Sequence, residues 1–232
     1  MGSKEVGVTK LRAGFASLLL LAWCTVAGTA IAGEKFPGQV PDRSVIKTQE
    51  KVDSLVERGK YERAMFIYRH ELAPLGDKYA QYMIGFMHLA GKGVEEDVAA
   101  AAAWYRLAAE RQQETFVNEH RKLSSLLNDA QRRRADEIYV ALRSELGDAA
   151  LVANLIETDL QSLSDRIREN PFSQDSVSRS NFDRQETINE RRIKQLRARM
   201  TYLEEKLESD AGVIEIEQQR FAELEARVER EI

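Results

Sequence analysis

Few residues of this 232-residue chain are of the types that carry out chemistry, and their spacing forms no metal-binding or phosphate-binding motif. The three histidines, His70, His88 and His120, make no H-E-x-x-H pair. The single cysteine, Cys24, excludes a disulfide framework within one chain. The run Gly91-Lys92-Gly93 lacks the spacing of a phosphate-binding loop. We therefore expect no cofactor, no metal site and no catalytic residue.

Charged side chains are abundant but nearly balanced. The chain has 34 Lys and Arg against 38 Asp and Glu, a net charge of −4. A nucleic-acid-binding surface needs a clear basic surplus. The densest basic cluster, Arg132–Arg134, is followed at once by Asp136 and Glu137. We interpret the charges as solvated helix surfaces and expect no nucleic-acid partner.

Residues 1–32 have the features of a secretory signal. Three basic residues precede an uncharged run over 13–32, and small residues at Ala30 and Ala32 predict cleavage between Ala32 and Gly33. Cleavage would remove three basic residues and one acidic residue, leaving 31 against 37, or −6, over 200 residues without a thiol. This predicts a periplasmic protein with no stable membrane span. The alternative is an uncleaved signal that anchors the chain in the inner membrane.

The rest of the sequence divides by composition into four segments. With only 4 Pro and 13 Gly, most of it is free of helix breakers, which predicts an all-α protein. Residues 33–43 contain two Pro and two Gly and should form a flexible lead-in. Helical patterns fill 44–168, a Ser-rich stretch over 169–180 predicts a linker, and 181–232 is a charged helical tail.

The most specific pattern lies in residues 78–111, where small, aromatic and glycine positions alternate at helical spacing. Gly91 and Gly93 can adopt the positive φ values that end a helix and turn the chain, and Asp97 can cap the next helix. The positions that carry the pattern are Ala80, Tyr82, Ile84, Gly85, Gly91, Gly93, Val94, Asp97, Ala101, Trp104, Tyr105, Ala108 and Ala109. The pattern resembles the Sel-like repeat, a relative of the tetratricopeptide repeat. Residues 55–68 resemble a tetratricopeptide hairpin more weakly.

This resemblance implies a fold and a role. Each unit would be a pair of antiparallel helices, and about three stacked neighbours are needed to bury the apolar faces. Helices over 116–168 should therefore supply a closing layer. Stacked hairpins form a curved groove, for which Gln81 and His88 are the candidate lining residues. The family's roles are in adaptors and assemblies, often in the bacterial cell envelope.

The tail over 181–232 has a seven-residue apolar period, which is typical of a coiled coil. The seam residues are Ile193, Leu196, Met200, Leu203, Leu207, Ile214, Phe221, Leu224 and Val228. Because the phase is unchanged on both sides of Gly212, we predict one long helix that can form a homodimer. The alternatives are that this helix packs back along its own domain or docks on another protein.

Together these patterns predict a short α-solenoid of helical hairpins followed by a long coiled-coil helix. The function that we expect is a non-enzymatic scaffold that binds another envelope or secreted protein. One alternative is a cell-wall or β-lactam hydrolase, as described for some relatives of this repeat class, which would need a serine nucleophile with a nearby lysine. The other is a purely structural spacer.

Overall fold

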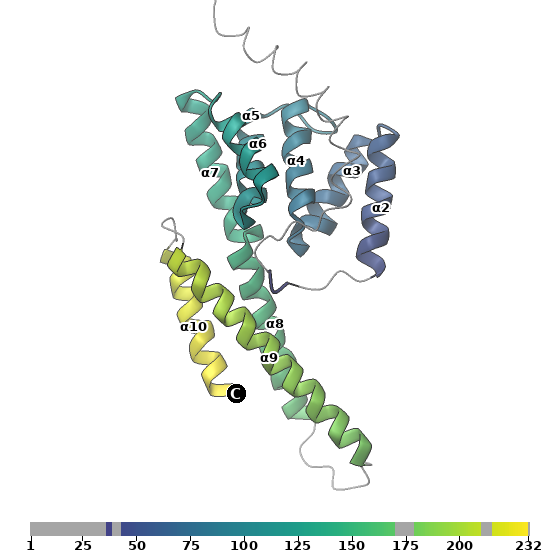
Figure 1. The fold of residues 1–232 in the computed structure, drawn as a ribbon, viewed down its shortest axis with the longest axis vertical. Coiled ribbons are helices and arrows are strands. Elements are labelled where there is room, and N and C mark those ends of the chain that lie inside the picture. Colours follow the sequence, from purple (N-terminus) through teal and green to yellow (C-terminus); the bar gives the residue numbers. More distant parts are fainter. Residues whose placement is uncertain (1–35, 39–42, 170–178, 210–214, 232) are drawn as a thin grey trace, which may run out of the picture.

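The computed structural model describes residues 36–38, 43–169, 179–209 and 215–231, and within these ranges the protein is helical without a β-strand. In chain order the helices are α2 (Arg43–Glu57), α3 (Tyr61–Ile67), η2 (Tyr68–Leu72), η3 (Ala73–Leu75), α4 (Lys78–Ala90), α5 (Val98–Ala108), η4 (Ala109–Arg111), α6 (Glu114–Ser124), α7 (Asp129–Leu146), α8 (Asp148–Glu169), α9 (Arg179–Ser209) and α10 (Glu215–Glu231) (Figure 1). The predicted all-α class is confirmed. None of these described helices is long and apolar enough to cross a bilayer. The predicted signal over 1–32, its cleavage site at Ala32 and Gly33, and nearly all of the predicted linker lie outside the described residues.

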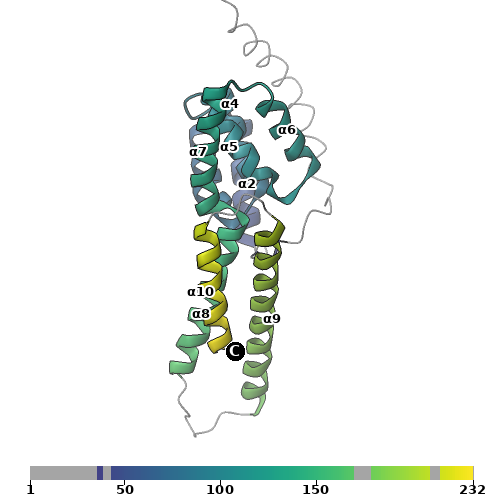
Figure 2. The ribbon, with the colours of Figure 1, turned by 90° about the vertical axis from the view of Figure 1, so that its left-hand side faces the viewer.

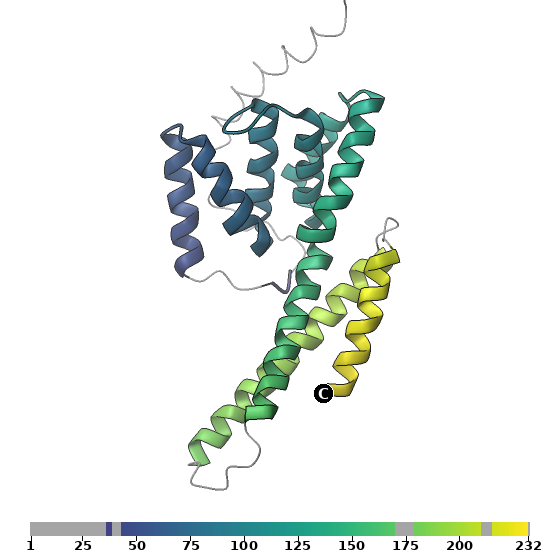
Figure 3. The same ribbon diagram turned by 180° about the vertical axis from the view of Figure 1, so that it is seen from behind.

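Helices α2 to α7 form a layer of helices that lie side by side (Figures 1 and 3). Helix α2 packs on α3, and α4 packs on α5. Both α6 and α7 make their main contacts with α5 rather than with each other. Helices α6 and α7 therefore both cover α5 and do not form a further hairpin like α2–α3 or α4–α5.

The turn between α4 and α5 requires two glycines. Gly91 ends α4 with φ +61°, and Gly93 has φ +72°. A Cβ added at Gly93 would lie 2.4 Å from the backbone carbon of Tyr61, so this loop passes directly over the start of α3. The Asp97 side chain then caps α5 by accepting hydrogen bonds from two backbone N–H groups of its first turn, both at 3.0 Å.

Close packing between α4 and α5 forms the centre of the layer. A Cβ at Gly85 would lie 2.5 Å from the Tyr105 ring, so only glycine lets the two helices approach this closely. The Tyr82 ring stacks on Tyr105 and on Phe116, with centroids 4.9 and 5.3 Å away. The buried members of the predicted repeat pattern are Ala80, Tyr82, Ile84, Gly85, Ala101, Trp104, Tyr105, Ala108 and Ala109.

The tail differs from the single long helix that its apolar period predicted. Helix α9 ends at Ser209 and α10 begins at Glu215, and both pack against α8 and against each other (Figure 2). Helix α8, expected to close the repeat domain, therefore belongs to a three-helix bundle with the tail. The reason is that α8 carries its own apolar stripe at Val152, Ile156 and Leu160, which the seam can cover without a second chain.

The described seam residues are buried or half-buried. Leu196, Leu203 and Leu224 are at most 3% exposed and pack with the α8 stripe. The half-buried seam residues are Ile193, Met200, Leu207, Phe221 and Val228. Ile214 lies outside the described residues. A constant seven-residue phase is thus compatible with a reversal of chain direction, because each arm of the hairpin keeps its own apolar face.

The lead-in, expected to be flexible, is in contact with the folded part at residues 36–38. The Phe36 ring packs edge-on against Tyr202 of α9, with ring centroids 5.9 Å apart. The Pro37 carbonyl accepts a hydrogen bond from Arg199, also on α9. The composition of this segment did not indicate that Phe36 would pack against another aromatic ring.

Candidate functional site

A cleft of about 670 Å³ lies where the α4–α5 loop approaches the first turn of α7. Its apolar lining comes from Val94, Val98, Ala99 and Ala130. Polar side chains line the remainder, among them His88, Glu95, Glu96, Asp97 and Arg134. A concave surface with an apolar lining and a few converging polar groups is the usual form of a ligand site.

His88, one of the two residues predicted to line a groove, lines this cleft. Burial is the main influence on its pKa and lowers it, with Arg69 acting in the same direction and Asp97 opposing. The ring is therefore neutral at pH 7, with one nitrogen as a donor and the other as an acceptor. The buried Nδ1 atom has no hydrogen-bond partner within the described part of the chain. A buried polar atom without a partner costs about 1–3 kcal/mol. Because Nδ1 is buried, the rest of the imidazole is what lines the cleft.

The charges around the cleft are predominantly acidic. Glu95 and Glu96 are exposed at its edge, whereas Asp97 is held by its capping role and by Arg134, whose Nη2 lies 2.7 Å from Oδ2. Arg134 belongs to the basic cluster noted in the sequence, and among the residues that line the cleft it is the one Lys or Arg, against three carboxylates. With His88 neutral, the cleft keeps a net negative charge. It therefore favours a ligand with a basic group.

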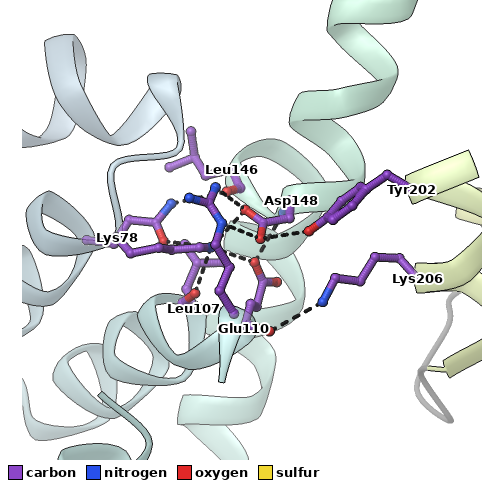
Figure 4. A network of polar contacts seen from close by, with 9 residues as sticks. Lys78, Leu107, Glu110, Leu146, Asp148, Tyr202 and Lys206 are labelled. Atoms are coloured by element: carbon purple, nitrogen blue, oxygen red, sulfur yellow. Dashed lines mark hydrogen bonds and ion pairs between the residues drawn. The ribbon is translucent and has the colours of Figure 1, made fainter. Parts of the chain in front are cut away.

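The prediction that Gln81 also lines a groove is wrong, because its side chain is fully buried. It lies on the same helix as His88 but at the end that meets the bundle. Its Nε2 donates to the Leu146 carbonyl at 3.2 Å, and its Oε1 accepts from Lys78 at 3.1 Å. Through these two hydrogen bonds Gln81 is part of a buried polar network between the layer and the bundle. Figure 4 shows Lys78 and Leu146 in this network.

Lys78 lies at the centre of this network and is 5% exposed. Its ammonium group is 2.8 Å from Glu110 Oε2 and 3.0 Å from Asp148 Oδ1, and it donates to the Leu107 carbonyl at 3.0 Å. Its three N–H groups donate to Gln81 Oε1, the Leu107 carbonyl and Glu110 Oε2, and Asp148 adds an ion pair from α8. A lysine this deeply buried needs such complete pairing.

Asp148 completes the pairing at the first residue of α8. Arg111 donates to both of its carboxylate oxygens, from Nε at 2.9 Å and from Nη2 at 2.8 Å. Burial alone would raise the pKa of Asp148, but Lys78 and Arg111 outweigh it and hold that pKa below its usual value. Its carboxylate is also favoured at a helix N-terminus.

Helix α9 joins the same network from the bundle side (Figure 4). The Tyr202 hydroxyl donates to Asp148 Oδ2 at 3.3 Å, and Lys206 donates to the Glu110 carbonyl at 3.4 Å. Sequence reasoning missed this network, because Lys78, Asp148 and Tyr202 are far apart in the chain and form no motif. The one signal in the sequence is a charged residue at the start of two helices, Lys78 and Asp148. Charged residues at such positions are common on exposed surfaces.

The other two histidines lie apart from the cleft. His70 is exposed on η2, with its ring 4.7 Å from that of Phe66. His120 is half-buried on α6, and burial together with Arg106 lowers its pKa. Across the described ranges no three His, Cys, Asp or Glu side chains converge as a metal site would require.

One serine and one lysine have the S-x-x-K spacing that a serine hydrolase of the β-lactamase class would need. Ser44 and Lys47 lie in the first turn of α2, where both side chains are exposed. Sequence reasoning overlooked this spacing. Neither residue lines the His88 cleft, so the hydrolase alternative receives no support from the geometry.

No family model, curated protein or solved structure matches the chain.

Proposed function

We propose that the protein is a non-enzymatic scaffold that binds a short basic segment of a partner protein in the His88 cleft. The observation that carries this proposal is the cleft itself, in which the half-buried His88 lies beside an apolar lining and an acidic edge. A peptide supplies the matching groups, namely a basic side chain for the acidic edge and an apolar side chain for Val94 and Val98.

The sequence supports the same role. Residues 78–111 resemble the Sel-like repeat, whose members act as adaptors, and residues 1–32 have the pattern of an export signal. We therefore place the partner among envelope or secreted proteins. The layer α2–α7 then acts as the short solenoid that presents the cleft, and the α8–α10 bundle is its structural support.

A selection of random short peptides displayed on phage, applied to the chain from Gly33, tests the proposal. We expect enriched peptides to combine Lys or Arg with an adjacent apolar residue. Their binding should weaken with added salt, because Glu95 and Glu96 lie at an exposed edge. His88→Ala should weaken binding by about tenfold, since the imidazole surface that lines the cleft is lost. Val98→Asp should abolish binding.

The control for the introduced charge is Leu126→Asp, which changes an apolar residue that is 56% exposed and lies outside the cleft. This variant should bind the selected peptides as the unmodified chain does. Peptides without basic residues, or binding that survives both cleft variants, would contradict the proposal. Circular dichroism on each variant separates a loss of binding from a loss of folding.

A further inference from the structure

The segment Phe36–Gly38 lies at the junction between the helix layer and the bundle. The Arg111 guanidinium carbon is 3.7 Å from the centroid of the Phe36 ring, which is the geometry of a cation–π contact. The edge of Tyr202 completes the aromatic surroundings. One residue later, the Pro37 carbonyl accepts a hydrogen bond from Arg199 Nε at 3.1 Å.

The groups that receive this segment are held in place by other partners. Asp148 accepts two hydrogen bonds from Arg111 and one from the Tyr202 hydroxyl. Arg199 forms an ion pair with Asp159 of α8. None of these contacts involves Phe36 or Pro37, so the receiving groups keep their positions when the segment leaves.

Gly76 provides the room for the aromatic ring. It ends η3 in the left-handed region with φ +76°. A Cβ there would lie 3.0 Å from Phe36 Cε1 and 2.9 Å from Arg111 Nη2. Glycine at this position therefore serves the turn and also leaves space for the ring beside the guanidinium.

We propose that this junction is a binding site for a short peptide segment with an aromatic residue, whose ring and following carbonyl are recognised, and that Phe36–Pro37 occupies it within the same chain. The aromatic ring is recognised by Arg111 and Tyr202, and the next carbonyl by Arg199. The residues of this site line no part of the His88 cleft, so the site is separate from the proposed function. A segment of the same chemistry from another molecule competes with Phe36 for it.

The test uses the chain from Gly33, which includes every residue that the structure describes, and a fluorescein-labelled peptide with the sequence of residues 33–43. Phe36→Ala empties the site, so this variant should bind the peptide at least tenfold more tightly than the unmodified chain does. A peptide with Ala in place of Phe should not bind. Phe66→Ala is the matched control, because Phe66 is an exposed aromatic residue on α3 and its removal leaves the site occupied.

Equal binding by Phe36→Ala and the unmodified chain, or equal binding of the Ala peptide, would overturn the proposal. A second measurement applies if Phe36→Ala does not fold. The variant Phe36→Trp places a tryptophan in the site, and its emission is obtained by subtracting the spectrum of the unmodified chain. Excess unlabelled peptide should displace this tryptophan into water, which shifts its emission to the red. An unchanged spectrum at saturating peptide would also overturn the proposal. His88→Ala should leave binding of this peptide unchanged, which separates this site from the cleft.

Discussion

Asp148 is 2% exposed and contacts Lys78, Arg111 and Tyr202, which come from three different elements. A buried carboxylate is costly unless its partners replace the water that it loses. Here two cations and a hydroxyl do so, and the pKa of Asp148 is lowered as a result. The charge of this one residue therefore links α4, η4 and α9 to the start of α8.

We expect Asp148→Asn to reduce the free energy of unfolding by about 3 kcal/mol at pH 7, since Lys78 and Arg111 lose a charged partner. Because the pKa is lower in the folded state, the carboxylate stabilises the fold above its unfolded pKa of about 3.9 and loses that effect as the pH falls toward the folded value. The difference between variant and unmodified chain, measured by urea denaturation, should therefore narrow below about pH 4.

The control for this charge is Glu157→Gln, which removes the ion pair with Arg220 on the bundle surface, where the two side chains are 44% and 34% exposed. We expect a change below about 1 kcal/mol there, because water screens the pair. If Asp148→Asn and Glu157→Gln had equal effects, the buried network would not hold the junction together.

Helix α8 connects the two parts of the molecule, the helix layer α2–α7 and the bundle α8–α10. Its first residue belongs to the polar network, and its apolar stripe at Val152, Ile156 and Leu160 is covered by α9 and α10. Helix α10 contributes Leu224, which is 2% exposed, and its Arg220 bonds to Asn154 and Glu157 of α8. Helix α10 thus completes a core that α8 and α9 begin.

Truncating Leu224 to Ala should destabilise the protein by about 2–4 kcal/mol, because the lost methyl groups leave a cavity between three helices. Val140→Ala on α7 is the control, since this residue is 49% exposed and should change the free energy of unfolding by less than about 0.5 kcal/mol. Both are measured by urea denaturation followed by circular dichroism. An effect of Leu224→Ala no larger than that of the control would mean that α10 is not docked on α8 in solution.

At the scale of the whole molecule, the apolar seam of the tail is already covered by the chain itself. The outward positions of α9 and α10 whose side chains are described are polar or alanine, among them Arg197, Glu204, Gln218 and Glu223. A second copy would therefore find no apolar stripe on these outward faces. The homodimer predicted from the seven-residue period would require the bundle to open.

We expect the chain from Gly33 to have the mass of a single chain in size-exclusion chromatography with multi-angle light scattering, independent of concentration over the micromolar range. A mass of two chains would favour the coiled-coil homodimer instead. Leu203→Glu distinguishes the two further. If the chain is a monomer, this variant places a charge inside the bundle and lowers the free energy of unfolding, and the measured mass does not change. If the chain is a dimer, the variant also separates it into single chains, and the measured mass falls.

The sequence by itself determined the features that depend on neighbouring residues. Helical class follows from composition, and the roles of Gly91, Gly93 and Asp97 follow from backbone geometry within one turn. The apolar period likewise identified the buried positions of the tail, such as Leu196 and Leu224, because helical phase determines which face avoids water.

Which element covers each apolar face depends on contacts between segments that are far apart in the chain. Gln81 and His88 lie on the same helix, yet one is sealed against the bundle and the other lines a cleft, since the elements that meet the two ends of α4 differ. The seam of the tail could equally have faced another chain. It faces α8 because an apolar stripe in the same chain is present at higher effective concentration than one in a second molecule.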